Sequence, residues 1–488
     1  DAPRAGPVSP DDGPPARYRF GPLERRGLVA GWRGGQIGAV AVGLMMAVVT
    51  LRASSSPVGV AVAVAAVAVA VGAATWPIGG RTAEEWAPDA MRHAAVLTGR
   101  RRPVRQSVFD ALRVVPLEVD GLGSVGVLHD QLRGTYTAVV GVSAPGFVLL
   151  GEQDKVRRVD EWSGVLAALA RDRSTVHRLQ WIERVVLTPP RTVTPGTAIH
   201  TEAQASYEAL LSAEAGASWR HEVHLGVTVR AARSGWTRAE TRVDAATCAS
   251  LLREVAALRR RLADASLDVS TVLAPDAVVA LLRDTLDPGP SPVGPTSAPA
   301  RSSPDPVGPL PSPVGGDEWP WPMAVEVAWG RVHADGTWHA TFWVSEWPRI
   351  DVGPDFLAPF LLPSAVRRTV SVVMEPLGPV EAARKIEKAR TADIADAEIR
   401  RRGGFLATAR RRREEEVLAR RELELADGHA HYRFTGYVTV SAADLDGLDE
   451  AVATVEQSAA RAGIELRRCY GAQLESLLCA LPLGRGLL

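Results

Sequence analysis

Cysteine is scarce in this sequence, with three residues among 488, at Cys248, Cys469 and Cys479. An odd number without CxxC spacing excludes a regular disulfide framework and a cysteine-based zinc site. The scarcity is typical of a protein in a reducing compartment.

Net charge is absent as well, because 56 Lys and Arg residues balance 56 Asp and Glu residues. The balance argues against an overall basic field and predicts no sequence-specific nucleic-acid partner. Two local basic runs, 100–105 and 410–413, are interpreted as a membrane-flanking cluster and as part of a solvated helix.

Catalytic signatures are also lacking. No G-x-x-x-x-G-K-[ST] phosphate-binding loop occurs, and neighbouring residues form no Ser-His-Asp or paired-carboxylate arrangement. The sequence therefore predicts a protein that is not an enzyme, with no catalytic residue, no cofactor and no metal site.

What the sequence does contain is a stretch between Arg33 and Arg81 in which Arg52 is the one charged residue. Apolar runs lie on either side of it, at 34–51 and 57–78, and each is close to the roughly 20 residues of a membrane-spanning helix. We expect a transmembrane helical hairpin over residues 31–80. A cleaved signal peptide fits less well, because the first run begins far into the chain and a second span follows.

Arginines lie at both outer ends of this hairpin. They are Arg17, Arg19, Arg25, Arg26 and Arg33 before the first run, and Arg81, Arg92, Arg100, Arg101, Arg102 and Arg105 after the second. Because positive charge is retained on the cytoplasmic side, both termini are expected in the cytoplasm. The chain is accordingly predicted to be a two-helix protein of the cell (inner or plasma) membrane.

Composition also marks the domain boundaries. Residues 287–317 are rich in Pro, Gly and Ser and are expected to form an extended linker. The remaining divisions are a disordered or juxtamembrane segment at 1–30, a first α/β module at 81–286 and a second at 318–488.

The two modules share an order of elements. Each has a strand, at 221–229 or 432–440, followed by a helix whose apolar residues are spaced by four, three and four. These stripes are Leu251, Val255, Leu258 and Leu262 in the first module and Leu448, Val452, Val455 and Ala459 in the second. A short strand (267–272 or 464–469) and a short helix (277–283 or 473–479) follow.

Upstream elements match more loosely. In the first module strands are expected at 135–142 and 175–187 around a helix at 153–170, and in the second at 338–344 and 369–374 around a helical piece at 355–361. The predicted fold class is α+β, with two related ferredoxin-like (split βαβ) modules and helices on one face of each sheet.

A charged helical segment interrupts the second module. It covers residues 380–426 and breaks at Gly403 and Gly404, which predicts an antiparallel helical hairpin over 379–426 that projects from the sheet.

Three weaker motifs are interpreted as structural. Gly121, Gly123 and Gly126 match G-x-G-x-x-G but lack the strand and helix of a dinucleotide site, so a turn is favoured. His221 and His224 should point to opposite faces of a strand, which makes a shared metal improbable. His429 and His431 lack neighbouring ligands and are placed at a strand entry.

Tryptophan is concentrated in one region, at Trp319, Trp321, Trp329, Trp338, Trp343 and Trp347. A partner groove and a half-buried sheet core are both consistent with this density. The sequence leaves the two readings open.

Several phrases resemble the N-terminal portion of the CagE/TrbE conjugation ATPases. They are FVLLGEQDKVRRVDEWSGVLAAL, RLQWIERV, LLREVAALRRRLADASLDV and ADGHAHYRFTGYVTV, with LPLGRGL near the end. The apolar hairpin resembles the PrgI family, the small two-span subunit of the same machines. The whole, over about residues 17–488, is similar to an actinobacterial family of two-span proteins associated with conjugation-like ATPases.

The resemblance implies a role in type IV secretion, but this sequence lacks the phosphate-binding loop of the motor. We therefore expect a non-catalytic inner-membrane scaffold that docks a P-loop ATPase supplied in trans. Other expected partners are further membrane subunits and the lipid bilayer, and a homo-oligomer is left open. The alternatives are an EccE-like scaffold of a type VII secretion system and a membrane-bound enzyme with an unrecognised site.

Overall fold

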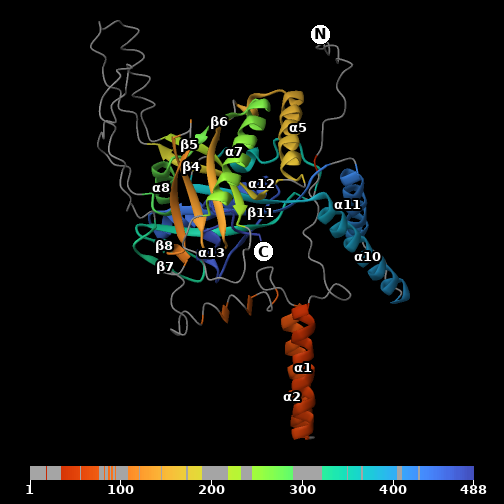
Figure 1. Ribbon diagram of the computed structural model, residues 1–488. Coiled ribbons are helices and arrows are strands. Elements are labelled where there is room, and N and C mark those ends of the chain that lie inside the picture. The colour runs from red at the N-terminus through yellow and green to blue at the C-terminus, as the bar shows by residue number, and fades with distance from the viewer. Residues whose placement is uncertain are drawn as a thin grey trace, which may run out of the picture.

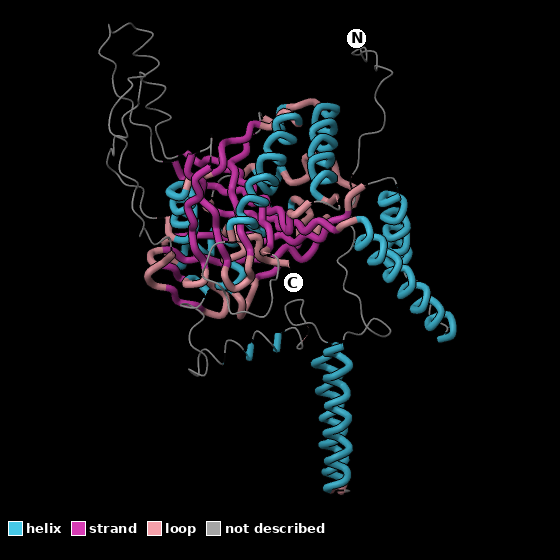
Figure 2. Tube along the Cα trace, viewed as in Figure 1, coloured by secondary structure: helices cyan, strands magenta, loops and turns pink. Residues whose placement is uncertain are grey.

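The computed structural model combines helices with one large antiparallel sheet, which confirms the α+β class (Figures 1 and 2). The described residues are 34–54, 56–75, 108–119, 121, 123–143, 146–171, 174–188, 218–231, 244–288, 321–348, 350–363, 366–403, 409–426 and 429–487, with residues 18, 82, 86, 87, 90, 91 and 94.

Two apolar helices, α1 (Gly34–Ala53) and α2 (Pro57–Thr75), pack together as a hairpin that precedes the sheet. A Cβ atom on Gly43 would lie 2.3 Å from Cβ of Ala70, so glycine permits close contact of the helices. The Gln36 side-chain amide donates to the Ala74 carbonyl at 2.7 Å. Both helices are long and apolar enough to cross a membrane, as predicted.

The sheet contains 12 strands. Those of the first module are β1 (Leu112–Val119), β2 (Gly123–Asp130), β3 (Thr135–Ser143), β4 (Val176–Thr188), β5 (Ser218–Arg230) and β6 (Asp268–Val272). Those of the second are β7 (Val325–Val327), β8 (Val332–Ala334), β9 (Thr337–Glu346), β10 (Arg368–Leu377), β11 (His431–Ala442) and β12 (Glu465–Arg468).

The order of these strands repeats about the middle of the sheet. It runs β1-β2-β3-β5-β4-β10-β11-β9-β8-β7, with β6 beside β3 and β12 beside β9. From its outer edge toward the middle of the sheet, the first module has the strand order β1, β2, β3, β5, β4. The second module, from the opposite edge, has the matching order β7, β8, β9, β11, β10. The two modules meet where β4 and β10 pair antiparallel, from Arg368↔Val185 to Met374↔Leu179. We call this β4–β10 junction the central seam.

Helices cover both faces of the sheet, so the expectation of helices on one face is wrong. On the first face lie α5 (Glu152–Leu169), α7 (Ala245–Asp264) and α12 (Leu445–Arg461), and on the second lie α8 (Pro275–Leu286) and α13 (Gln473–Leu477). The physical reason is that strands such as β2 are apolar on both sides. Val127 faces the α7 core, whereas the next residue, Leu128, faces α8.

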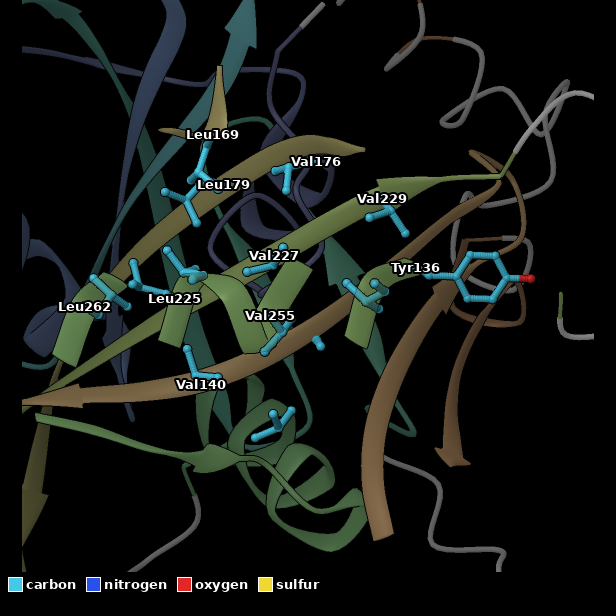
Figure 3. Packing of buried hydrophobic residues seen from close by; sticks show 14 of the residues in the cluster. Tyr136, Val140, Leu169, Val176, Leu179, Leu225, Val227, Val229, Val255 and Leu262 are labelled. Atoms are coloured by element: carbon cyan, nitrogen blue, oxygen red, sulfur yellow. The ribbon is translucent and has the colours of Figure 1, made fainter. Parts of the chain in front are cut away.

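The α7 core shows why the predicted helix forms where it does (Figure 3). All four residues of its apolar stripe, from Leu251 to Leu262, are at most 1% exposed. Full burial of such a side chain stabilises the fold by about 1.5–3 kcal/mol. Trp181 of the central strand β4 packs against this cluster and also against the α12 cluster, and so joins the first-face cores of the two modules.

Between β10 and β11 the chain forms α10 (Pro379–Gly403) and α11 (Ala409–Ala426). They pack on each other, and Arg390 of α10 pairs with Glu422 of α11 at 2.7 Å. Figure 1 shows both helices projecting from the sheet, at the residues for which a helical hairpin was predicted. The shorter helical pieces are η1 (Phe147–Leu149) and α9 (Ala358–Leu361).

The chain before the hairpin of α1 and α2 contacts the part of the chain after it. Tyr18 and Val352 exchange both backbone hydrogen bonds, at 2.8 and 2.9 Å. The predictions for the rest of residues 1–30 lie outside the described residues. Of the predicted linker, Asp287 and Pro288 are described; Asp287 follows α8 and accepts a hydrogen bond from Thr337 at 2.8 Å.

Candidate functional site

The first face of the central seam holds a buried acid, Glu183 on β4, which lies beside Arg368, the first residue of β10. They are 3% and 2% exposed, and Arg368 Nε lies 3.9 Å from Glu183 Oε2. Glu183 Oε1 contacts His221 Nδ1 at 2.6 Å. Burial lowers the pKa of Arg368, and the negative charge of Glu183 opposes that shift.

Arg368 also has partners within its own module. Its guanidinium donates to the carbonyls of Leu361 and Pro363 and lies 5.3 Å from the ring centroid of Phe360. The cluster thus links β4 of the first module to β10 of the second, and removal of Glu183 or Arg368 alone would leave an uncompensated buried charge.

The second face of the seam is covered by residues 479–487, which we call the C-terminal strap. Gln180 of β4 donates to the Cys479 and Leu481 carbonyls at 3.0 and 2.9 Å, and its own carbonyl accepts from Gly484 N at 2.8 Å. It also donates to Ser371 Oγ on β10 at 2.8 Å. One amide side chain thus joins both modules to the strap.

Charged and phenolic groups complete the attachment of the strap. Arg178 donates to the Gly484 and Leu487 carbonyls at 2.9 and 3.0 Å and pairs with Glu375 at 3.1 Å. Arg485 pairs with Asp130 at 2.6 Å, and the Tyr437 hydroxyl donates to the Gly486 carbonyl at 2.9 Å. The strap therefore contacts β2 and β4 of the first module and β11 of the second.

The α10–α11 hairpin is a different kind of surface. A narrow stripe of α10, formed by Ala382, Ile386 and Ala389, is at most 6% exposed. Ion pairs lie along its surface, among them Lys385–Glu381 at 2.9 Å and Arg420–Glu424 at 2.9 Å. Ile394 and Leu423 are 64% and 67% exposed. The hairpin thus exposes apolar side chains among charged ones.

The glycine and histidine motifs lie where they were predicted, except for Gly126. Gly121 and Gly123, with φ of 78° and 74°, lie at the connection of β1 to β2, and Gly126 is inside β2. His221 contacts Glu183 on the first face, while His224 lies on the second. Burial, and then the charge of Arg184, lowers the pKa of His224 to about 4.

The second histidine pair lies at a strand entry, as expected. His429 is exposed just before β11, and His431 is the first residue of that strand. Within the described ranges no three His, Cys, Asp or Glu residues gather as metal ligands.

The tryptophans divide between core and partly exposed positions. Trp321 is 4% exposed and donates to the Leu112 carbonyl, whereas Trp338 and Trp343 are half-buried on β9. Trp329 stacks on Trp86, with ring centroids 5.7 Å apart. Trp319 lies outside the described residues.

Sequence reasoning missed the seam residues Arg178, Gln180, Glu183 and Arg368 and the strap residue Arg485. The available signal was polar side chains on both faces of an otherwise apolar strand, because β4 carries Gln180 and Glu183 where a central strand would usually be apolar. Their partners across the seam and in the strap lie about 185 to 355 residues away and leave no local pattern.

A scan against protein-family models and a search of curated proteins found no match to this chain.

Proposed function

We propose that this protein is a non-catalytic membrane scaffold of a type IV secretion or conjugation-like complex and docks a P-loop ATPase supplied in trans. The observation that carries the proposal is the α10–α11 hairpin, which projects from the sheet with Ile394 and Leu423 exposed. The same chain carries two helices long and apolar enough to anchor it in a membrane. A membrane-anchored sheet with one projecting docking element is the arrangement expected of a scaffold.

We further propose that each module is ferredoxin-like, as the resemblance implies. The support is the strand order: β6-β3-β5-β4 in the first module and β12-β9-β11-β10 in the second, with every neighbouring pair antiparallel. In each case two strands joined through a helical connection, α5 or the short α9, are separated in the sheet by the next strand. That is the split βαβ arrangement.

We also propose that both ends of the membrane hairpin lie in the cytoplasm. The backbone pairing of Tyr18 with Val352 supports the placement of both ends on one side, because Tyr18 precedes α1 and Val352 follows α2. The flanking arginines favour the cytoplasmic side. A cysteine replacing Ser55 should react with an impermeant thiol reagent in intact cells, and one replacing Ser107 should not; labelling at 107 alone would invert the topology.

The docking role is tested by co-purification from the native host in mild detergent. The variant Ile394→Ser/Leu423→Ser should recover much less ATPase than the parent. The matched control Met323→Ser/Ile350→Ser changes two side chains that are 79% and 74% exposed but lie off the hairpin, and it should recover the parental amount.

A deletion of residues 379–425 closed by a short Gly/Ser turn complements the point variants. Leu377 and His431 pair directly, so β10 and β11 can remain joined without the hairpin. Membrane insertion should be kept and ATPase recovery lost. Unchanged recovery would remove the hairpin as the docking site, hydrolysis of ATP by the pure chain would overturn the scaffold role, and recovery of a type VII ATPase would favour the EccE-like alternative.

A further inference from the structure

The end of the α10–α11 hairpin farthest from the sheet combines two basic runs that are separate in sequence. The chain leaves β10 along α10 and returns to β11 along α11, so the end of α10 and the start of α11 lie together. Arg400, Arg401 and Arg402 lie in the last turn of α10, and Arg410, Arg411, Arg412 and Arg413 in the first turns of α11. We call these seven residues the arginine tip.

The tip is richer in positive charge than the rest of the hairpin, although Arg402 pairs with Glu398 at 2.9 Å. No Asp or Glu occurs between Glu398 and Glu414. Nearer the sheet, acids and bases alternate and pair, as in Arg390–Glu422 at 2.7 Å. Because the whole chain has zero formal net charge, the tip is a local positive site on a neutral protein.

The hairpin holds the tip well away from the sheet. With 25 residues, α10 is about 37 Å long at 1.5 Å per residue. In Figure 1 it slants from the sheet toward the end of the molecule at which α1 and α2 lie. The tip is thus carried toward the membrane that these helices are suited to cross.

We propose that the arginine tip binds the phosphate groups of anionic lipids at the surface of the membrane in which the chain is anchored. Guanidinium groups match phosphate oxygens in charge and geometry, and clusters of four to eight basic residues beside a membrane favour anionic headgroups. Anchoring in the same membrane gives these lipids a high effective concentration. The inference rests on the proposed cytoplasmic topology, and it leaves Ile394 and Leu423 for the ATPase.

The test uses the full-length chain in nanodiscs, with its three buried cysteines replaced by serine and one cysteine placed at Ala409 for an environment-sensitive fluorophore. Nanodiscs of phosphatidylcholine alone are compared with nanodiscs that also contain phosphatidylglycerol. The fluorophore should report a less polar environment in the anionic nanodiscs only. The difference should shrink as salt is added, because salt screens exposed charges.

Two variants that remove the same charge from the same hairpin separate the tip from its stem. The tip variant replaces Arg410, Arg411, Arg412 and Arg413 by Gln. The stem variant replaces Arg384, Arg390, Arg420 and Arg421 by Gln. The tip variant should lose binding by a factor on the order of ten or more, since each basic residue near an anionic surface contributes about 1 kcal/mol. The stem variant should keep the lipid-dependent signal, with helix content checked by circular dichroism.

Equal signals in the two kinds of nanodisc, or equal losses in the two variants, would overturn the proposal. A signal produced in neutral nanodiscs by added duplex DNA, and absent with anionic lipid, would assign the tip to nucleic acid instead. No ATPase is present in this measurement, so its result does not depend on whether the protein docks an ATPase.

Discussion

Among single residues, the two glycines of the C-terminal strap are the ones most closely determined by their contacts. Gly484 has a φ of 61°, and a Cβ atom there would lie 2.5 Å from Thr228 Oγ1. Gly486 has a φ of 123°, and its Cβ would lie 2.6 Å from a ring carbon of Tyr437. The glycines of LPLGRGL are therefore explained by packing, independently of any resemblance.

The variant Gly484→Ala should lower the free energy of unfolding by about 1–3 kcal/mol, because it combines an unfavourable φ with a steric clash. Thermal unfolding in detergent measures the loss. The matched control is Gly164→Ala on α5, where a Cβ atom would meet nothing within 4 Å. It should be neutral or stabilise the protein by up to about 1 kcal/mol. A control as damaging as the strap variant would contradict the packing argument.

His224 should make the protein sensitive to acid. Burial lowers its pKa from 6.5 to about 4, so between those values the unfolded chain binds more protons than the folded one. The stabilisation is therefore complete above pH 6.5 and falls as the pH drops toward 4, by on the order of 1–3 kcal/mol for this group. In His224→Asn the fall in melting temperature between pH 7 and pH 5 should be smaller; an unchanged profile would exclude His224 as a source.

Among helices and strands, the α1–α2 pair depends on small residues at its contact. Gly43→Ile should force the helices apart, because its Cβ would overlap Ala70. Gly38→Ile is the control, since nothing lies within 4 Å of a Cβ there. With cysteines at positions 36 and 74, oxidative cross-linking in membranes should fall in the first variant and persist in the second. Equal yields would show that Gly43 is not a contact.

Element positions were largely predictable from sequence, because periodicity is a local property. The expected helix at 153–170 is α5 (Glu152–Leu169), and the expected strand at 175–187 is β4 (Val176–Thr188). The central seam was not predictable, since no local pattern says that β4 pairs with β10, 183 positions later in the Arg368↔Val185 pair. Helices on both faces were missed because the apolar stripe of α8 does not reveal which face it covers.

In the chain as a whole, several contacts should keep the modules together without the connecting chain. They include seven β4–β10 residue pairs, the strap, the Lys155–Asp355 ion pair at 2.9 Å and the Tyr432 hydroxyl bond to the Leu166 carbonyl. A protease site inserted within 290–315 should yield two fragments that co-elute in size-exclusion chromatography. Gln180→Ala, which removes bonds to both Ser371 and the strap, should promote their separation. Separation of the parental fragments would show that the seam is weak.

The repeated strand order about the seam has a consequence for anyone who divides this protein. Either module alone would end in a long unpaired edge, β4 of 13 residues or β10 of 10 residues, with open N–H and C=O groups. Such an edge is a template for pairing with a second copy of itself, because the two modules already meet through corresponding strands. A truncated half would therefore form symmetric dimers or aggregates. Insolubility of such a half would result from the missing partner strand and would not mean that the half is misfolded.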